Sequence, residues 1–303
     1  MDSSRVDVGR RLALPGGGAV GYALYGDPNG KPVLALHGAP ASRLMFEIGD
    51  APARRLGLAI HAPDRPGYGL TPMDENPTLE SRAEHLVRVA DALGLDRFAV
   101  LGVSGGTPYA VALAARLGSR VTALALVSPV GPIADIWAGH AATRHAAGDW
   151  RRRFIFLHMP RFWLGFTFGA RLAALVFRMA PDAASKAMSW TLGRADRRIV
   201  RRPEVHKALV RMTQEAVRNG TDGGVADMKI YGSPWRVDLS RITAPAILWQ
   251  GTVDTIVPPE ASFLLGTLIP NCRMVRLDGA GHFWVFDHVE DVLREMRGMV
   301  DFT

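Results

Sequence analysis

A serine, an aspartate and a histidine stand in three glycine-rich segments of this chain. Ser104 is the centre of the pentapeptide GVSGG at 102–106, Asp254 ends the run GTVD, and His282 lies in GAGHFW at 279–284. A serine hydroxyl becomes an effective nucleophile when a histidine takes its proton and a carboxylate orients that histidine. These three residue types, in the order Ser, Asp, His, predict acyl transfer through a covalent acyl-enzyme.

Each of the three residues comes just after a short apolar run that is typical of a buried strand. The runs are FAVLGV at 98–103, APAILWQ at 244–250 and CRMVRL at 272–277. Because the carboxyl ends of parallel strands lie at one edge of a sheet, we expect the three side chains to meet there. Ser104 would occupy a sharp strand-to-helix turn, which requires glycines beside it and places its hydroxyl at a helix N-terminus.

The rest of the chain alternates between further strands and helices. The sequence predicts a hairpin over 11–14 and 19–25, strands at 32–36, 58–61 and 121–127, and helices at 78–93, 105–117 and 289–299. This alternation predicts the α/β class, with a mostly parallel, doubly wound sheet covered on both faces. Between 131 and 239 no convincing strand occurs. We therefore expect a core domain of residues 1–130 and 240–303, interrupted by a helical cap or lid domain at 131–239.

The composition fits a globular protein with one large core. The chain has 303 residues, 48% hydrophobic and 21% charged, and a formal net charge of +7. The predicted insertion holds 18 Lys and Arg against 9 Asp and Glu, so the excess of positive charge belongs to that segment. We interpret its arginines as a solvated face, with attraction of anionic substrates or of a membrane surface as the alternative.

The sequence lacks the usual signs of export or membrane insertion. Cys272 is the single cysteine, so no internal disulfide is expected, and the first residues contain no apolar leader segment. The most apolar stretch, at 162–177, contains Arg171 and falls short of the roughly 20 residues that span a bilayer. These features predict a cytoplasmic protein without stable membrane insertion.

With these motifs in place, almost the whole chain resembles the α/β-hydrolase superfamily, in its carboxylesterase and proline-iminopeptidase-like branch with a helical cap. HGAP at 37–40 is similar to the oxyanion loop of that superfamily, and DRPGYG at 64–69 to its glycine-rich turn. The resemblance implies that the backbone N–H groups of Ala39 and Gly105 form the oxyanion hole and that His37 is structural. The fold it implies is the α/β-hydrolase fold.

The carboxylate that orients the histidine has alternatives. Some members of the superfamily take it after the strand that ends near Ser128, but residues 128–132 hold no carboxylate and Asp135 is the nearest acid. Asp254 could instead cap a turn, and His282 could be a core histidine with satisfied hydrogen bonds. We assign the catalytic triad to Ser104, Asp254 and His282.

Aromatic residues of the insertion and those beside His282 are the candidates for substrate binding. The predicted set is Phe162, Trp163, Phe166, Phe283 and Trp284. If these side chains face the serine, an apolar acyl or aromatic group would be preferred. The expected partner is a small-molecule ester of small to medium size, and a homodimer is left open.

Two other functions compete with esterase activity. A proline iminopeptidase-like aminopeptidase must bind a cationic α-amine, for which a basic cap is a poor host, and Gly105 stands where the resemblance would place Trp. A non-catalytic ligand-binding member of the fold is the second alternative. We expect no nucleic-acid partner, because the chain has no recognised module for one. We also expect no cofactor, and no metal because HExxH and cysteine clusters are missing.

Overall fold

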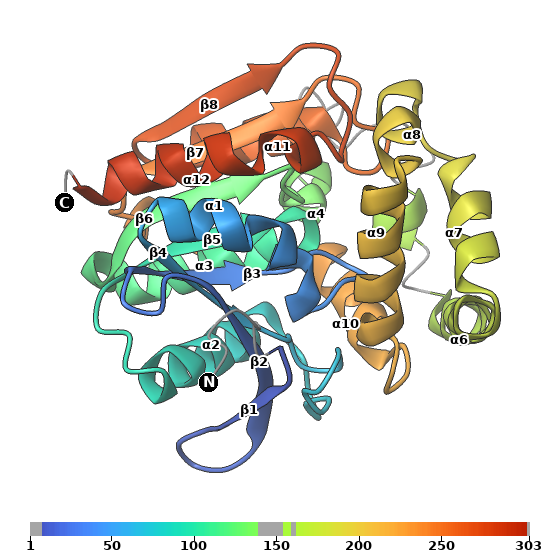
Figure 1. The fold of residues 1–303 in the computed structure, drawn as a ribbon, viewed down its shortest axis with the longest axis horizontal. Coiled ribbons are helices and arrows are strands. Elements are labelled where there is room, and N and C mark those ends of the chain that lie inside the picture. The colour runs from blue at the N-terminus through green and yellow to red at the C-terminus, as the bar shows by residue number, and fades with distance from the viewer. Residues whose placement is uncertain (1–7, 139–153, 159–161, 302–303) are drawn as a thin grey trace.

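The computed structural model describes residues 8–138, 154–158 and 162–301, and its strands form one eight-stranded sheet (Figure 1). The strands are β1 (Arg10–Ala13), β2 (Ala19–Gly26), β3 (Lys31–Leu36), β4 (Leu58–Pro63), β5 (Phe98–Val103), β6 (Val121–Val127), β7 (Ala246–Gly251) and β8 (Cys272–Leu277). Their order across the sheet is β1-β2-β4-β3-β5-β6-β7-β8. β1 and β2 pair antiparallel, β2 joins β4 antiparallel, and every later pair is parallel.

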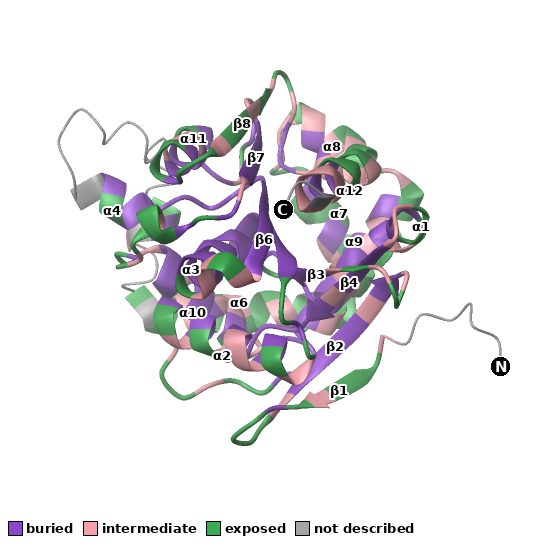
Figure 2. Cartoon of the chain, turned by 90° about the vertical axis from the view of Figure 1, so that its left-hand side faces the viewer, coloured by how far each residue is buried: buried purple, intermediate pink, exposed green. Residues whose placement is uncertain are grey.

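The central strands are buried on both faces, as their sequences require. Every residue of β5 (FAVLGV) and β6 (VTALALV) is buried, whereas β1 at the sheet edge is largely exposed (Figure 2). Continuous apolar runs of this kind are typical of parallel strands covered by helices on both sides. The carboxyl ends of β5, β7 and β8 therefore share one edge, which is where Ser104, Asp254 and His282 follow.

Helices of the core cover the two faces of the sheet separately. They are α1 (Asp50–Arg55), α2 (Leu79–Ala92), α3 (Thr107–Leu117), α11 (Pro259–Leu268) and α12 (Val285–Asp301). Side chains of α2, α3 and α11 join one buried apolar cluster, and those of α1 and α12 join the other. Each face of the sheet thus has its own apolar core, which holds the strand ends in a fixed frame.

The described elements between β6 and β7 are all helical. They are α4 (Ile133–Ala138), a short π-helical turn (Phe154–His158), α6 (Trp163–Met179), α7 (Pro181–Ser189), α8 (Arg194–Val200), α9 (Pro203–Ala216), α10 (Asp222–Tyr231) and a short 3₁₀ helix (Leu239–Arg241). We call the helices α6 to α10 the helical insertion. Its side chains Val200, Leu209 and Met212 pack on Ala41 and Phe283 of the core.

These observations confirm the predicted fold class, including the helical segment before β7. The boundaries of a separate cap domain at 131 and 239 stay a prediction. Within the described residues, no helix combines the length and the apolar character needed to cross a bilayer. Residues 139–153, which include four of the arginines of the predicted insertion, lie outside the described part of the chain.

Candidate active site

Ser104 sits at a strained turn between β5 and α3. Its φ is +51°, in the left-handed region that residues with a side chain rarely adopt. The glycines on either side permit this turn: a Cβ on Gly102 would lie 2.8 Å from the Cβ of Ala110, and one on Gly106 would lie 2.2 Å from the carbonyl oxygen of Leu36. The pentapeptide therefore lifts the serine from the end of β5 while packing closely on α3 and β3.

The three loops bring Ser104, His282 and Asp254 into direct contact. His282 Nε2 lies 3.0 Å from Ser104 Oγ, and His282 Nδ1 lies 2.7 Å from Asp254 Oδ2. All three side chains are buried. Because a carboxylate only accepts, Nδ1 carries the proton toward Asp254 and Nε2 of the neutral ring accepts from the serine hydroxyl. This is the arrangement in which a histidine can take a proton from serine.

Hydrogen bonds and charge keep Asp254 ionised beneath the imidazole. Its Oδ1 accepts the backbone N–H groups of Ile256 at 2.8 Å and Val257 at 3.0 Å, and Gln250 Nε2 donates to Oδ2 at 3.1 Å. Burial alone would raise the pKa of Asp254, but His282 and the two N–H donors outweigh it and lower the pKa below its usual value.

The same pair of residues moves the pKa of His282 in the other direction. Burial opposes the charged imidazolium, yet attraction to Asp254, with a smaller contribution from Asp196, raises the pKa of His282 above its ordinary 6.5. A more basic imidazole takes the serine proton more readily.

The alternative acid position is occupied by a residue of a different kind. Ser128 follows β6 there, while Asp135 accepts the backbone N–H of Trp235 at 3.0 Å, away from the imidazole. Asp254 is therefore the carboxylate that contacts His282 Nδ1.

The structure also places the two residues of the expected oxyanion hole beside Ser104. A Cβ built on Gly38 would lie 3.6 Å from Ser104 Oγ, so the 37–40 loop passes directly over the hydroxyl. A Cβ on Gly105 would lie 3.2 Å from the Cβ of Ala39, which makes Ala39 and Gly105 close neighbours. His37 is fully buried, accepts the backbone N–H of Arg65 at Nε2 (3.0 Å), and has a pKa well below its ordinary value because of burial and Arg65.

A cavity of about 310 Å³ opens above Ser104, between the core and the helical insertion. Its walls include Leu209 and Met212 of α9 and Phe283 and Phe286 of the core. Of the described residues that line it, His282 is the one with a titratable side chain. The site therefore suits an uncharged, largely apolar group beside a serine.

Three of the five aromatic candidates for substrate binding do not line this cavity, one does, and the side chain of the fifth is not described. Phe283 lines it, with its ring edge-on to His282 at a centroid distance of 5.4 Å. Trp284 does not: it is buried in the core and its indole N–H donates to Ser128 Oγ at 3.0 Å. Phe162 is 68% exposed and Phe166 half-buried, and neither lines the cavity. Trp163 begins α6, but its side chain lies outside the described residues.

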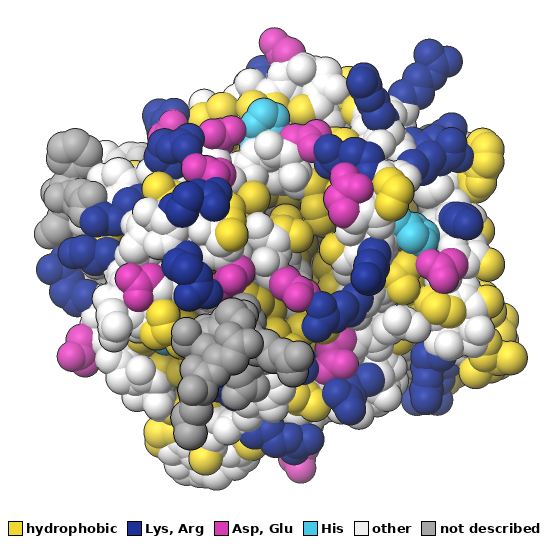
Figure 3. Space-filling model, in the orientation of Figure 1, with side chains coloured by type: hydrophobic (Ala, Val, Ile, Leu, Met, Phe, Trp, Pro, Cys, Tyr) yellow, Lys and Arg dark blue, Asp and Glu magenta, His cyan; other side chains and the backbone are white. Residues whose placement is uncertain are grey.

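The physical reason why Phe162 and Phe166 do not line the cavity is the rotation of α6. Leu164, Phe168, Leu172 and Met179, at helical spacing, are all at least half exposed. Figure 3 shows hydrophobic side chains at the edge of the molecule where α6 and α7 lie, with Lys and Arg side chains among them. α6 thus turns much of its apolar surface outward, and among its described side chains Phe177 is the one that reaches the cavity.

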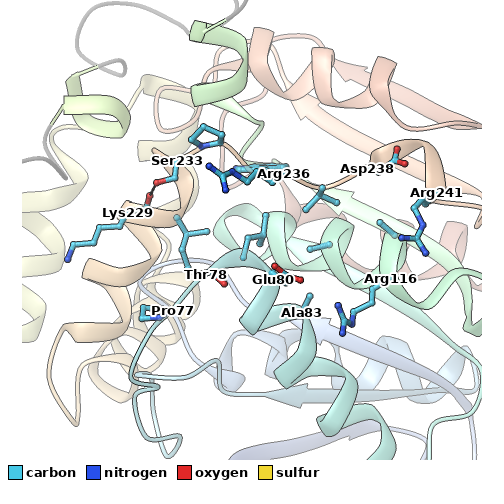
Figure 4. Close-up of a pocket in the computed structure, with 17 residues that line it drawn as sticks. Pro77, Thr78, Glu80, Ala83, Arg116, Lys229, Ser233, Arg236, Asp238 and Arg241 are labelled. Carbon is cyan, nitrogen blue, oxygen red and sulfur yellow. Dashed lines mark hydrogen bonds between the residues drawn. The ribbon is translucent and has the colours of Figure 1, made fainter.

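A larger hollow of about 580 Å³ lies elsewhere and is not the site of this chemistry (Figure 4). It is bounded by Thr78 and Glu80 at the start of α2, by Arg116 of α3, and by Lys229 and Arg236 near the end of the insertion. It contains none of Ser104, Asp254 or His282. Size alone therefore does not identify the active site here.

Three polar residues that touch the triad loops were missed at the sequence level. Asp196 of α8 is fully buried and accepts the backbone N–H of Phe283 at 2.7 Å. Ser128 Oγ donates to the carbonyl of His282 at 3.1 Å, and Gln250 supports Asp254. Ser128 follows directly after β6, in the superfamily's alternative position for the acid, and that place was a signal for contact with the histidine loop. Asp196 gave no such signal, since it lies in an arginine-rich helix.

Comparison with known proteins agrees with the fold described above. The family model described as alpha/beta hydrolase fold matches residues 31–289. The chain is 26% identical to 2-hydroxymuconate semialdehyde hydrolase of Pseudomonas putida over 236 residues, covering 77% of this chain and 73% of that protein. It is 28% identical to the pimeloyl-[acyl-carrier protein] methyl ester esterase of Aromatoleum aromaticum over 239 residues, or 78% and 84% of the two chains. An alpha/beta hydrolase fold protein from Nakamurella multipartita superposes with a TM-score of 0.67 at 26% identity, covering 98% of this chain and 99% of its own.

Proposed function

The chain belongs to the alpha/beta hydrolase fold family, and we propose that it is a serine hydrolase that cleaves carboxylic esters through an acyl-enzyme at Ser104. One observation carries the proposal: Ser104 Oγ, His282 and Asp254 form a continuous hydrogen-bonded chain at the floor of a mainly apolar cavity. The methyl ester esterase among the relatives supports the ester bond as the target.

The reaction follows from these contacts. His282 Nε2 takes the proton of Ser104 as Oγ attacks the ester carbonyl, and Asp254 stabilises the imidazolium that forms. The backbone N–H groups of Ala39 and Gly105 receive the oxyanion, where each donor is worth about 3–4 kcal/mol of transition-state stabilisation. His282 then protonates the leaving alcohol, and water releases the acyl group by the same steps with Ser104 as the leaving group.

The cavity favours an ester over the aminopeptidase alternative. A free α-amine needs a buried carboxylate or several carbonyl oxygens as partners, and no described lining residue carries a carboxylate. We expect the acyl group to be apolar and of short to medium length, since the cavity is about 310 Å³ in volume.

The test is hydrolysis of p-nitrophenyl butyrate by the purified protein and by Ser104→Ala. We expect Ser104→Ala to lose about a thousandfold or more in kcat, because the nucleophile is removed. Ser189→Ala is the matched control: Ser189 lines the same cavity, but its hydroxyl donates to the Lys186 carbonyl at 2.7 Å rather than contacting His282.

Undiminished turnover in Ser104→Ala would show that the nucleophile is wrong. Faster cleavage of a proline aminoacyl amide than of the ester would favour the aminopeptidase. Ligand binding without any turnover by the unmodified protein would favour a binding protein with this fold.

A further inference from the structure

A fully buried aspartate of the insertion lies within hydrogen-bond distance of four side-chain donors near the active site. Asp227 of α10 accepts Arg65 Nη1 and the Tyr68 hydroxyl at Oδ2, both at 2.6 Å, and the Tyr109 hydroxyl at Oδ1 at 2.5 Å. The Tyr231 hydroxyl lies 3.1 Å from Oδ2. All five side chains are at most 2% exposed. None of these residues takes part in the proton transfers described above.

Arg65 connects this aspartate to the 37–40 loop, which supplies the Ala39 N–H of the oxyanion hole. Its Nη2 donates to the carbonyl of Gly38 at 2.9 Å, and its Nε donates to the carbonyl of His37 at 3.2 Å. The Gly38 carbonyl and the Ala39 N–H belong to the same planar peptide group. A guanidinium that fixes this carbonyl therefore fixes the direction in which the Ala39 N–H points, and it polarises that N–H as a donor.

Tyr231 connects the same aspartate to Gly105, the second residue of the oxyanion hole. Its hydroxyl donates to the carbonyl of Gly105 at 2.7 Å, and the proximity of Asp227 leaves this single proton shared between the two acceptors. That carbonyl belongs to the peptide that follows Gly105, so the contact holds the position of the residue rather than the peptide that carries the Gly105 N–H. A Cβ on Gly105 would lie 2.3 Å from the Tyr231 oxygen. Glycine after the nucleophile is thus what allows the hydroxyl to approach.

Burial and charge in this cluster keep the Tyr231 hydroxyl protonated, so its role as a donor does not change. Burial and the charge of Asp227 raise the pKa of Tyr231 well above its usual value, so the hydroxyl remains a donor. The charges of Arg65 and Asp227 offset each other. The remaining N–H groups of Arg65 donate to backbone carbonyls, and the tyrosine hydroxyls donate to the carboxylate of Asp227. A buried ion pair is a weak source of stability compared with apolar packing, so a positional role is the better reason for its presence.

We propose that Asp227, Arg65 and Tyr231 form a positioning network that holds the Gly38–Ala39 peptide and the residue Gly105 in the geometry of the oxyanion hole and ties that geometry to helix α10 of the insertion. The inference rests on the proposed function, because the oxyanion hole has a role only if Ser104 attacks a carbonyl. The three residues are positioning residues: they contact the peptide groups and one another rather than the substrate.

The test compares Tyr231→Phe with Tyr109→Phe. Both substitutions remove one buried hydroxyl from Asp227, but Tyr231 alone of the two also contacts an oxyanion-hole residue. We expect Tyr231→Phe to lower kcat for p-nitrophenyl butyrate about tenfold with KM within about twofold, since donor alignment acts on the transition state. Tyr109→Phe should keep kcat within about twofold of the unmodified protein, while its Tm falls at least as far as the Tm of Tyr231→Phe.

A second readout follows the transition state directly. A boronic acid forms a tetrahedral adduct with serine, and its affinity should fall in Tyr231→Phe by the same factor as kcat/KM. Gly105→Ala, whose methyl group displaces the Tyr231 hydroxyl, should show the same loss, and the double variant Gly105→Ala/Tyr231→Phe should lose no more than the worse single variant.

Equal kcat losses in Tyr231→Phe and Tyr109→Phe, or an unchanged kcat and boronate affinity in a folded Tyr231→Phe, would overturn the positioning network. Additive losses in the double variant would overturn it as well. These results differ from a failure of the proposed function, which would appear as Ser104-independent turnover or no turnover in the unmodified protein.

Discussion

At the scale of single residues, the imidazole of His282 is held from several directions. Asp254 binds Nδ1, Ser128 binds the backbone carbonyl of His282, and Asp196 binds the next N–H along the chain, that of Phe283. The ring therefore has little freedom to turn away from Ser104. Two of these three contacts come from polar residues that no motif marked.

Asp196 offers a prediction about pH dependence. Asp196→Asn keeps an oxygen for the Phe283 N–H but removes a buried negative charge that contributes to raising the pKa of His282. We expect the pKa of His282 to fall. Because His282 acts as a base in its neutral form, the acidic limb of the kcat/KM profile should move to lower pH.

The measurement is kcat/KM for p-nitrophenyl butyrate across the acidic and neutral range. Asp182→Asn is the control: it removes an insertion carboxylate that is 74% exposed and pairs with His206, so its acidic limb should stay in place. An unmoved limb in Asp196→Asn, or a shift to higher pH, would contradict the prediction.

At the scale of elements, the end of β6 supports the loop after β8. Ser128 adopts a φ of +46° as β6 ends, which turns its hydroxyl toward the His282 loop. That hydroxyl accepts the indole N–H of Trp284 at 3.0 Å and donates to the carbonyl of His282 at 3.1 Å. Trp284, expected at the substrate, instead anchors the His282 loop to the end of β6, two strands away.

We predict that Ser128→Ala loosens this loop. The substitution leaves a buried indole N–H and a buried carbonyl without their partner, which costs about 1–3 kcal/mol of unfolding free energy. We expect kcat to fall as well, because His282 is less firmly placed. Denaturant unfolding and ester kinetics measure the two effects.

Ser262→Ala separates stability from catalysis in that experiment. Ser262 is fully buried and donates to the carbonyl of Pro129 at 2.6 Å, next to Ser128 but without contact to the His282 loop. It should lose stability while retaining kcat. If Ser262→Ala loses as much kcat as Ser128→Ala, the effect on the loop is not specific.

At the scale of the whole molecule, the cavity above Ser104 lies between the core and the insertion. α9 supplies Leu209 and Met212 to its wall, whereas α6 turns Leu172 outward. Hydrogen bonds also join the core to the insertion. The Gly193 N–H donates to Thr255 Oγ1, and Arg43 Nη1 donates to both Asp64 of the core and Glu215 of α9. The position of the insertion thus determines the depth of the cavity.

We predict that Leu209→Trp shortens the acyl chain that the cavity accepts. The larger side chain fills part of a space of about 310 Å³. kcat/KM for p-nitrophenyl octanoate should fall about tenfold or more relative to p-nitrophenyl acetate, because the excluded methylene groups lose their apolar contacts. The ratio of the two kcat/KM values is the measurement.

Leu172→Trp is the matched control, with the same substitution on α6, where Leu172 is 52% exposed and does not line the cavity. It should leave the ratio unchanged. A larger effect in Leu172→Trp than in Leu209→Trp would restore α6 as the substrate-binding helix.

The sequence alone determined the strands, the helices and the turn at Ser104, because each depends on short-range patterns: apolar runs, helical spacing, and glycines where a side chain would collide. The sequence also predicted that Ser104, Asp254 and His282 follow three strand ends and meet, because the carboxyl ends of parallel strands lie at one edge of the sheet. Tertiary structure decided the rest. The partners of Asp227, Asp196 and Ser128 lie far away along the chain, and the outward rotation of α6 depends on how the insertion packs, so no local pattern encodes either.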